Sequence, residues 1–500
     1  MTESAPESPN QAPESLREQV RSAIFWRSGT QILAQMISWA STLAVVRILT
    51  PADYGLFAMT SVILVFLNFL NGSSFASVLV RDESVSPQRI RQAFGMLLLL
   101  NGALAAIQWF GAGAAAAYYH QPIIASLLRW QALLYLATPF LAVPEALLSR
   151  RMEFRTPAII TIVSTACGAA TAIGTALSGA GVWTLVAAPI VIFWTRAIML
   201  VVATRFYVWP SFDFRGAGGM MRFGSMLILS QGLWIVQSQA DVFIGGRMLD
   251  PHALGIYAEA LFLTQIVATK FVPPLNEVAF PAFARLQHDR EALAWAFLKA
   301  VRLVLLLTCP FYFGLAVSAA PAVETLFGAK WLEMAPLVAL LSLAMPVVTL
   351  QILFVPPLNA LGSPHIVARI AMAGAVSMPA VFLVAVRWGT LGLALGWLVA
   401  VPLLFAATFA MAHRTLRISV GGLVQAVAPA VTASLVMASV VEIAERYLIA
   451  PLPPLAAPTH LLLLGAIGGA SYAGILWWLA RDTAREALAL VIRRRTPAAA

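Results

Sequence analysis

Two cationic side chains lie inside long apolar stretches of the sequence, where a charge requires an explanation. Arg196 lies about nine residues, or roughly 13 Å along a helix, from one end of its stretch, close to the middle of a membrane. Lys270 lies two thirds of the way along another stretch. A charge at the bilayer centre costs about 2.5–3.5 kcal/mol or more, so both are functional candidates. Guanidinium binds phosphate in a bidentate way, which makes Arg196 the first candidate for contacting an anionic group.

Each of these cations also has a structural interpretation. Arg196 could form an ion pair or bond to backbone carbonyls, and either cation could extend to the membrane surface. Paired prolines, Pro273 and Pro274, follow Lys270 directly. Prolines inside a helix free backbone carbonyls, and broken helices often mark transporter sites. The sequence therefore predicts a hinge at these prolines, with Lys270 beside it as a possible anion contact.

Three acidic residues in the same region are candidates for binding a coupling ion: Asp241, Glu259 and Glu277. A carboxylate in apolar surroundings titrates near neutrality, which suits a proton or a small cation. Pairing with Arg247 or Lys270 is the structural alternative. Tryptophans near the ends of the stretches, Trp397 among them, could stack on sugar rings, although anchoring at the membrane interface is the commoner role.

The elements that carry these residues are predicted to be membrane-spanning helices. Of the 500 residues, 60% are apolar and 11% are charged, whereas soluble chains are about 45–50% apolar and about 25% charged. The apolar runs are about twice as long as the strands of an outer-membrane barrel. We therefore predict an all-α polytopic membrane protein with fourteen transmembrane helices. The predicted spans are 22–46, 55–80, 92–119, 123–148, 157–178, 181–205, 223–246, 254–280, 296–318, 334–361, 366–386, 389–412, 421–444 and 459–480.

The distribution of basic residues supports this count. If the N-terminus is cytoplasmic, 24 of the 32 Lys and Arg residues fall inside, six fall outside and two lie within spans. This is the bias that the positive-inside rule describes, and it places both termini in the cytoplasm. The net charge of +10 then reflects topology, so no nucleic-acid partner is expected. Residues 1–20 are predicted to be a disordered tail and residues 481–500 a basic tail.

The sequence contains an internal repeat. Arg47-Ile-Leu-Thr-Pro-Ala-Asp-Tyr-Gly-Leu-Phe-Ala58 resembles Arg247-Met-Leu-Asp-Pro-His-Ala-Leu-Gly-Ile-Tyr-Ala258 at an offset of 200. Two weaker matches follow in the same order, Trp183–Pro189 with Trp397–Pro402 and Ala146–Ser149 with Ala360–Ser363. The repeats are six helices apart, which predicts two parallel six-helix bundles, and transporters of this kind bind substrate between the halves. A tight turn at Pro-x-x-x-Gly is the alternative explanation of the first match.

This repeat gives the predicted domains: an N-lobe at 21–210, a C-lobe at 211–415 and two extra helices at 416–480. Arg47 and Arg247 occupy equivalent places in the repeat and join the candidates for binding an anionic substrate.

The sequence resembles the polysaccharide-flippase (Wzx-like, colanic-acid-exporter-like) branch of the multidrug/oligosaccharidyl-lipid/polysaccharide exporter superfamily. The segments that carry the resemblance are Leu49–Phe57, Arg150–Arg155, Asp241–Gly245, Leu254–Tyr257, Ala279–Leu286 and Leu326–Trp331. The resemblance implies an inner-membrane flippase that moves undecaprenyl-diphosphate-linked sugar repeat units by ion-coupled alternating access, with no cofactor beyond a proton or sodium gradient. It also implies membrane lipids, and a polysaccharide polymerase and chain-length regulator, as partners.

Other functions remain as alternatives. A multidrug or cation antiporter of the same superfamily is the first and a peptidoglycan-precursor flippase the second, but related drug exporters use an acid in their first span, and 22–46 contains none. An enzyme is disfavoured because the longest internal polar stretch, about 207–221, is short. The six histidines are scattered without metal-ligand spacing, no Walker motif is present, and both cysteines, Cys167 and Cys309, lie in apolar runs.

Overall fold

The computed structural model describes residues 11–71, 86–151, 153–213, 218–270, 272–450 and 456–479. All regular secondary structure in these ranges is helical, and they contain no strand. This confirms the predicted all-α class. The described residues fall into two compact units, 1–232 and 233–500.

The helices have the length and apolarity of membrane spans. Within the described ranges, twelve stretches are long and apolar enough to cross a membrane. One of them, Pro364–Leu416, contains two helices that are each long enough to span, Pro364–Ala385 and Gly389–Leu416, and the helix Gly218–Met248 is not among the twelve. Each of the fourteen predicted spans overlaps a helix. The chain is a multi-pass membrane protein, while the number fourteen and its division into six, six and two stay predictions.

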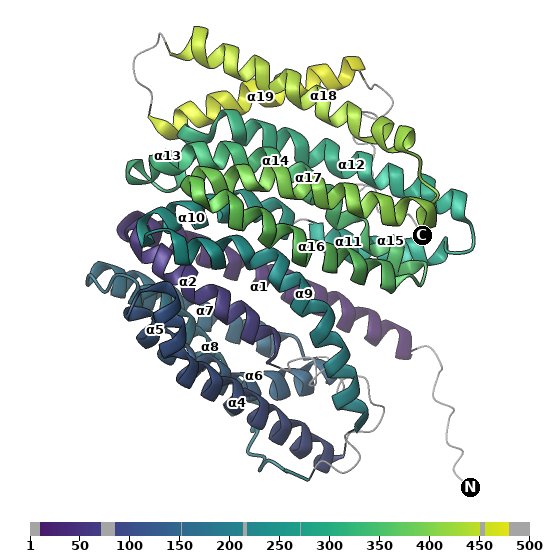
Figure 1. Ribbon diagram of the computed structural model, residues 1–500. Coiled ribbons are helices and arrows are strands. Elements are labelled where there is room, and N and C mark those ends of the chain that lie inside the picture. The colour runs from purple at the N-terminus through teal and green to yellow at the C-terminus, as the bar shows by residue number, and fades with distance from the viewer. Residues whose placement is uncertain are drawn as a thin grey trace. The chain divides into compact units, whose positions relative to one another are not determined.

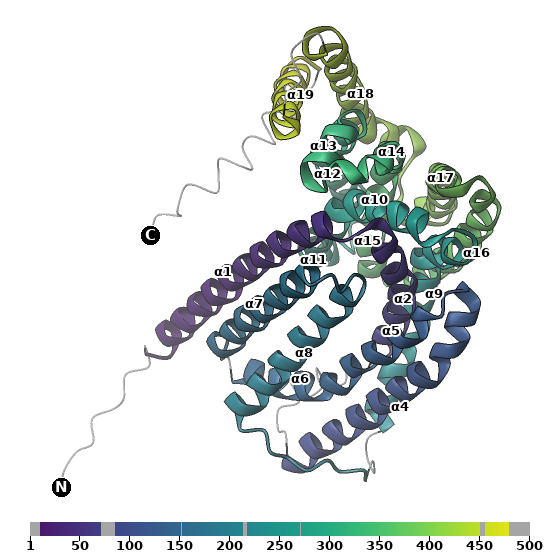
Figure 2. The same cartoon turned by 90° about the vertical axis from the view of Figure 1, so that its left-hand side faces the viewer.

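The first unit is a row of packed helices (Figures 1 and 2). Its helices are α1 (Gln11–Ile48), α2 (Pro51–Phe69), α4 (Pro87–Tyr119), α5 (Ile123–Gln131), α6 (Leu133–Arg150), α7 (Arg155–Leu177) and α8 (Trp183–Thr204). In Figure 2, α1, α7, α8 and α6 follow one another, and α4 packs on α6. Small residues permit the close approach of α7: Ser164, Gly168, Ala172 and Ala176 recur every four residues on its buried face.

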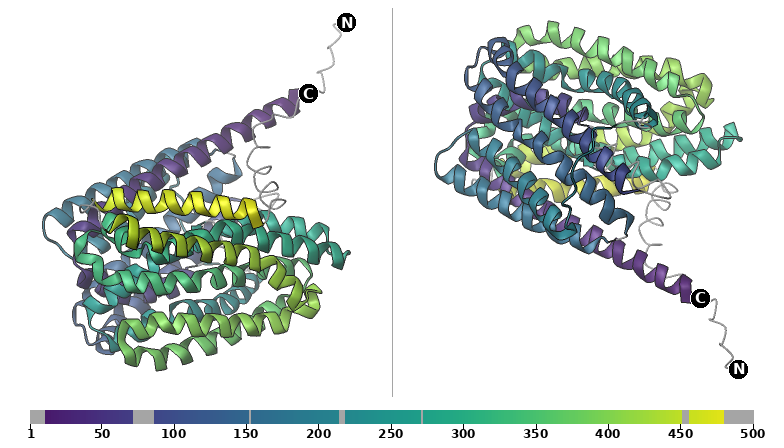
Figure 3. Two further views of the ribbon diagram at one scale, coloured as in Figure 1. Left: turned by 90° about the horizontal axis from the view of Figure 1, so that it is seen from above. Right: turned by 90° about the horizontal axis from the view of Figure 1, so that it is seen from below.

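The second unit is centred on four helices that contact one another in series. It contains the end of α9 (Gly218–Met248), then α10 (Pro251–Lys270), α11 (Val272–Arg285), α12 (Arg290–Val317), α13 (Ala319–Leu326), η1 (Ala329–Met334), α14 (Ala335–Leu353), α15 (Val355–Ala360), α16 (Pro364–Ala385), η2 (Val386–Trp388), α17 (Gly389–Leu416), α18 (Val420–Ala444), η3 (Glu445–Ile449) and α19 (Ala457–Leu479). Helix α12 packs on α14, α14 on α17 and α17 on α16. The rings of Phe297 and Phe354, 5.0 Å apart, lie in its main apolar core. Helices α18 and α19 run side by side, with α18 against α12 (Figure 3).

The repeat is visible in the boundaries of the helices. Helix α1 ends at Ile48 and α9 at Met248, and α2 begins at Pro51 and α10 at Pro251, so the offset of 200 holds on both sides of the connection. The motif Pro-x-x-x-Gly is therefore the first turn of a helix and not a tight turn, because proline suits the first helical position. At the preceding position, Thr50 and Asp250 both accept hydrogen bonds from backbone N–H groups of the new helix.

The order of helix packing is also repeated. Contacts of α4 with α6, α6 with α8 and α8 with α7 in the first unit correspond to α12 with α14, α14 with α17 and α17 with α16 in the second. Helices α8 and α17 both end at a left-handed arginine, Arg205 (φ 49°) and Arg417 (φ 52°). Pro189 and Pro402 lie inside these two helices, at similar distances from those ends. Each unit therefore has the same core arrangement, as a duplicated chain would.

Candidate functional site

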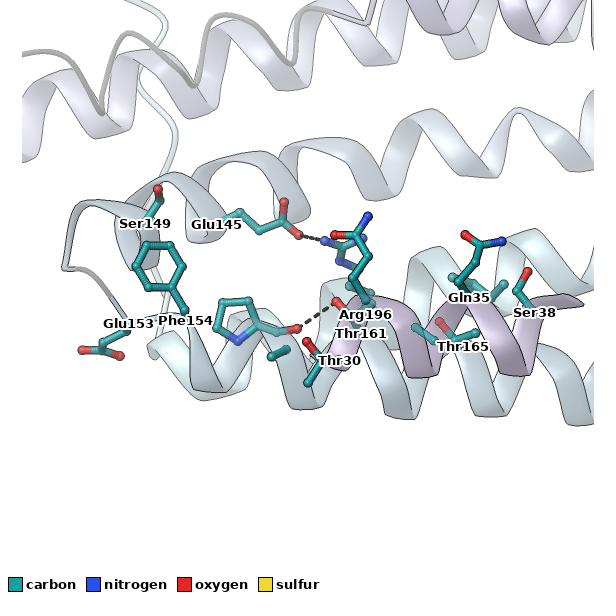
Figure 4. A pocket seen from close by; sticks show the side chains of 15 residues that line it. Thr30, Gln35, Ser38, Glu145, Ser149, Glu153, Phe154, Thr161, Thr165 and Arg196 are labelled. Carbon is teal, nitrogen blue, oxygen red and sulfur yellow. Dashed lines mark hydrogen bonds and ion pairs between the residues drawn. The ribbon is translucent and has the colours of Figure 1, made fainter. Parts of the chain in front are cut away.

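A cavity of about 550 Å³ lies within the first unit, between α1, α6, α7 and α8. Ligand sites commonly have volumes of roughly 300–1,000 Å³. Figure 4 shows polar side chains from these helices around it. The polar residues that line it are Thr30, Gln31, Gln35, Ser38, Glu145, Ser149, Glu153, Thr161, Thr165 and Arg196.

The polar lining follows from the faces that the helices turn toward the cavity. On α1, Gln31, Gln35 and Ser38 are spaced by four and three residues, which places them on one face. On α7, Thr161 and Thr165 are one turn apart, and the Thr161 hydroxyl donates to the Pro157 carbonyl at 2.8 Å. That hydroxyl oxygen can still accept a hydrogen bond. Amides and hydroxyls on two facing helices suit a ligand rich in hydroxyl groups.

Arg196 projects from α8 into the cavity wall and is paired. Its Nη2 atom lies 2.6 Å from Oε1 of Glu145 on α6, and the two side chains are 35% and 36% exposed. Figure 4 shows this ion pair between the two helices. The structural pairing considered for Arg196 is thus present, and it occurs in a cavity that a ligand could enter. Binding of an anion by Arg196 stays a prediction.

Glu145 is a site residue that the sequence interpretation missed. It lies near the end of the predicted span 123–148, and its charge within an apolar run was the available signal. It directly follows Pro144, and Pro139 also lies inside α6. Interior prolines remove helix hydrogen bonds, so this part of α6 is easier to deform than a regular helix.

A second polar site lies in the core of the second unit, around Asp241. The Tyr257 hydroxyl donates to Oδ2 of Asp241 at 2.6 Å, and the indole Nε1 of Trp397 lies 3.1 Å from the same oxygen. The indole nitrogen also lies 2.9 Å from the Tyr257 hydroxyl. The three residues come from α9, α10 and α17, and Asp241 and Tyr257 are both 0% exposed. We call this trio the Asp241 cluster.

One carboxylate oxygen of the Asp241 cluster, Oδ1 of Asp241, accepts none of these hydrogen bonds. Oδ1 of Asp241 is buried and has no hydrogen-bond partner in the described part of the structure. A buried carboxylate is costly unless its charge is neutralised, and a bound proton or cation does this. The partners found here are Tyr257 and Trp397, in place of the Arg247 or Lys270 pairing that the sequence left open.

Trp397 corrects one sequence interpretation. The sequence placed it among tryptophans that anchor at the membrane interface or stack on sugars. Its side chain is only 5% exposed and contacts Phe382. The indole is buried because its N–H has a partner in Asp241.

The remaining candidates of the second unit lie along α10 and α11. Glu259 is half-buried on α10, and no hydrogen bond or ion pair of this residue is found within the described ranges. Lys270 is the exposed last residue of α10, and α11 begins at Val272. The predicted break in the helix is therefore present, with Pro273 and Pro274 in the first turn of α11, where proline is tolerated. The side chain of Glu277 lies outside the described residues.

Arg47 and Arg247 lie in the last turns of α1 and α9, and both are exposed. A cation at a helix C-terminus interacts favourably with the helix dipole. The structure places Arg47 and Arg196 in the first unit, and Arg247 and Lys270 in the second.

The helices, the cavity and the duplicated packing can be compared with known proteins. A family model described as "Polysaccharide biosynthesis protein" matches residues 44–336, which is more than half of the chain. The chain belongs to this polysaccharide biosynthesis protein family. The matched range includes Glu145, Arg196, Asp241 and Tyr257, while Trp397 lies beyond it.

Relatives of this family member include transport proteins. The succinoglycan biosynthesis transport protein ExoT of Rhizobium meliloti is 28% identical over 341 residues, which cover 67% of this chain and 69% of ExoT. The lipopolysaccharide biosynthesis protein WzxC of Escherichia coli is 21% identical over 329 residues, 65% of this chain and 67% of WzxC.

Solved structures show the same fold at low sequence identity. The lipid II flippase MurJ in an inward closed conformation has a TM-score of 0.73 at 13% identity, covering 92% of this chain and 99% of MurJ. An inward-facing multidrug resistance transporter of the MATE family has a TM-score of 0.59 at 13% identity, covering 79% of this chain and 99% of the transporter. The family member thus has the fold of the superfamily that its sequence resembles.

Proposed function

We propose that the protein is a flippase that moves undecaprenyl-diphosphate-linked oligosaccharide repeat units to the periplasmic face of the inner membrane. Its product would supply exopolysaccharide, O-antigen or capsule synthesis. Membership of the polysaccharide biosynthesis protein family supports this, as do relatives named as transport and lipopolysaccharide biosynthesis proteins. It works as a secondary transporter and not as an enzyme, by alternating access between the two lobes.

The observation that carries the proposal is the cavity of the first unit. It offers one guanidinium, that of Arg196, together with the carboxylates of Glu145 and Glu153 and a wall of amide and hydroxyl groups. A lipid diphosphate needs a cationic partner while it crosses apolar surroundings, and guanidinium binds phosphate in a bidentate way. The amides and hydroxyls of α1 and α7 can exchange hydrogen bonds with sugar hydroxyls. Arg47, Arg247 and Lys270 are further cations for the diphosphate along its path.

Ion coupling is assigned to acidic residues of the second unit. Asp241 is the first choice, because it is fully buried and one of its oxygens has no partner within the described structure. Glu259 is the second and Glu277 the third. A proton or sodium ion that binds there would alter the packing of α9 against α10 and α17, and the hinge at Pro273 and Pro274 would let α10 and α11 respond.

The proposed orientation follows from the charge pattern of the sequence, and the proposed partners follow from the resemblance to the polysaccharide flippases. Both termini lie in the cytoplasm, and the lobes comprise residues 21–210 and 211–415, followed by two extra helices. Membrane lipids surround the helices, and a polysaccharide polymerase and a chain-length regulator are the expected protein partners.

The test is a gene deletion complemented with variants. Deletion should abolish one surface polysaccharide and accumulate lipid-linked repeat units in the cytoplasmic leaflet. Arg196→Gln should fail to restore the polysaccharide although the protein is inserted at the normal level, and Arg196→Lys should restore it only in part because Lys cannot bind phosphate in a bidentate way. Normal polysaccharide with altered drug or dye resistance would favour the antiporter. A defect in peptidoglycan precursors, with normal surface polysaccharide, would favour the lipid-precursor flippase.

A further inference from the structure

Glu145 forms an ion pair with the guanidinium of Arg196, which the proposed function assigns to the substrate. From this we infer that Glu145 is an internal competitor: its carboxylate holds Arg196 in the empty cavity, and a phosphate group of the substrate displaces it. The inference rests on the proposed function. It adds a second residue to the site and a reason for the site to prefer phosphate-bearing ligands.

The geometry of the pair is the first argument. Carboxylate and phosphate oxygens both accept hydrogen bonds from the same guanidinium donors. Nη2 of Arg196 already lies 2.6 Å from Oε1 of Glu145. An incoming phosphate therefore has to break this contact before it can use both outer nitrogens of the guanidinium.

The environment of the pair is the second argument. Both side chains are about one third exposed, at 35% and 36%, and both line the cavity. A ligand in the cavity can thus reach Arg196, and water can hydrate Glu145 once it is displaced. A pair of this exposure is weaker than a fully buried one, so an anion with two negative charges can compete for the guanidinium.

The backbone under Glu145 is the third argument. Pro144 directly precedes it, and Pro139 lies one and a half turns earlier in the same helix. Pro144 provides no N–H for the carbonyl of Phe140, so α6 can bend at this point at low cost. Glu145 can therefore swing away from α8 without unfolding a regular helix.

This exchange explains how an empty carrier avoids an uncompensated charge. Without ligand, Arg196 is neutralised by Glu145, and with ligand it is neutralised by phosphate. A neutral sugar cannot take the guanidinium from Glu145, so only ligands with a strong anion release the pair. The cavity therefore selects for the lipid diphosphate and not merely for hydroxyl groups.

The test is direct binding of farnesyl diphosphate, a short polyprenyl diphosphate, to the purified full-length protein by titration calorimetry. Glu145→Gln should bind about tenfold more tightly than the unmodified protein, because the competitor has lost its charge. Glu153→Gln removes the same charge from another cavity residue, and we expect a change of about twofold from the general charge alone. Glu145→Asp keeps the charge but shortens the reach to Arg196, so it should also tighten binding, and it covers the case in which Glu145→Gln folds poorly.

The outcomes separate the two proposals. Equal binding by Glu145→Gln, Glu145→Asp and Glu153→Gln would overturn the competitor role while leaving the flippase intact. Unchanged binding by Arg196→Gln would instead remove Arg196 from the diphosphate site of the proposed function. Loss of binding in Arg196→Gln together with tighter binding in both Glu145 variants would establish the exchange.

Discussion

The two units have the same core packing but carry different chemistry at equivalent positions. At an offset of 200, Ser41 of α1 corresponds to Asp241 of α9, and Phe57 of α2 corresponds to Tyr257 of α10. Ser41 and Asp241 are both buried. The acid and the hydroxyl that binds it therefore occur in the second unit only, at positions where the first unit has a small polar residue and an aromatic ring without a hydroxyl.

A second difference has the opposite sense: a charged pair occurs in the first unit, between α6 and α8, and among the described residues it is absent at the equivalent place between α14 and α17. Arg196 lies nine residues before the left-handed end of α8, and Thr408 lies nine residues before that of α17. Arg196 binds Glu145 of α6, whereas the Thr408 hydroxyl accepts a hydrogen bond of 2.7 Å from Gln351 of α14. The same pair of packed helices is thus joined by charges in the first unit and by neutral groups in the second.

This difference shows how the two units of a duplicated fold can carry different functional groups. In the proposed function, Arg196 serves the substrate diphosphate and Asp241 serves the coupling ion, and the two residues belong to different units. Arg196 is paired with the carboxylate of Glu145 in its own unit. The partners of Asp241 found in the described structure are instead the neutral groups of Tyr257 and Trp397. The coupling between Arg196 and Asp241 must then pass through motion of the helices.

The largest effect is expected at Asp241. Asp241→Asn keeps the shape and removes the charge that the proposed function assigns to the coupling ion, so transport should fall by about two orders of magnitude, equivalent to about 2.7 kcal/mol. Ser41→Ala at the equivalent place should leave transport within about twofold, because the proposed function assigns no coupling ion to Ser41. Export of the lipid-linked unit into the outer leaflet measures both. Full transport by Asp241→Asn would show that coupling uses another acid.

A smaller effect is expected from the groups that hold Asp241. Tyr257→Phe removes the hydroxyl and gives the second unit the residue type of Phe57. The buried carboxylate then loses a short hydrogen bond, which costs about 1.5–3 kcal/mol of stability. Thermal denaturation in detergent should show a lower melting temperature, whereas Tyr207→Phe at an exposed tyrosine should not. An unchanged melting temperature in Tyr257→Phe would mean that the Tyr257 hydroxyl does not contribute to the stability of the protein.

In the first unit, the close packing at Gly95 of α4 leaves no room for a side chain. The segment after α8 lies along α4: Ser211 N–H donates to the Arg91 carbonyl at 2.9 Å, and the Arg91 side chain donates to the Trp209 carbonyl at 3.1 Å. A Cβ at Gly95 would overlap the backbone oxygen of Ser211, which cannot rotate away. Gly95→Ala should therefore cost about 1–3 kcal/mol of unfolding free energy.

The control for this prediction is on the same helix. Gly102 of α4 has open space where a Cβ would stand. Gly102→Ala should be neutral or slightly stabilising, since alanine is the better helix former. A melting temperature equally low in both variants would show that the helix itself, and not the segment at Ser211, responds to the substitution.

The sequence predicted those features that depend on short stretches of chain. Apolar runs predicted the helices, and the repeated segment predicted a duplicated architecture, because both signals are carried by short stretches of sequence. Arg196 and Asp241 were identified because a charge in an apolar run is visible without a structure. Their partners were not identified: Tyr257 and Trp397 lie 16 and 156 residues from Asp241. Such pairings are set by which helix faces pack together, and a single sequence does not specify those faces.

The smallest effect is expected at Gly374 of α16, which is the site of a tight contact in the second unit. A Cβ there would overlap the side chain of Gln237 on α9, but a glutamine side chain can rotate away, unlike a backbone oxygen. Gly374→Ala should therefore cost less than about 1 kcal/mol, and the gain in helix propensity offsets part of it. Differential scanning fluorimetry of Gly374→Ala beside Gly95→Ala tests this ranking. A larger loss in Gly374→Ala would mean that Gln237 is held in place by its surroundings, and that the contact between α9 and α16 is as rigid as the one between α4 and the segment at Ser211.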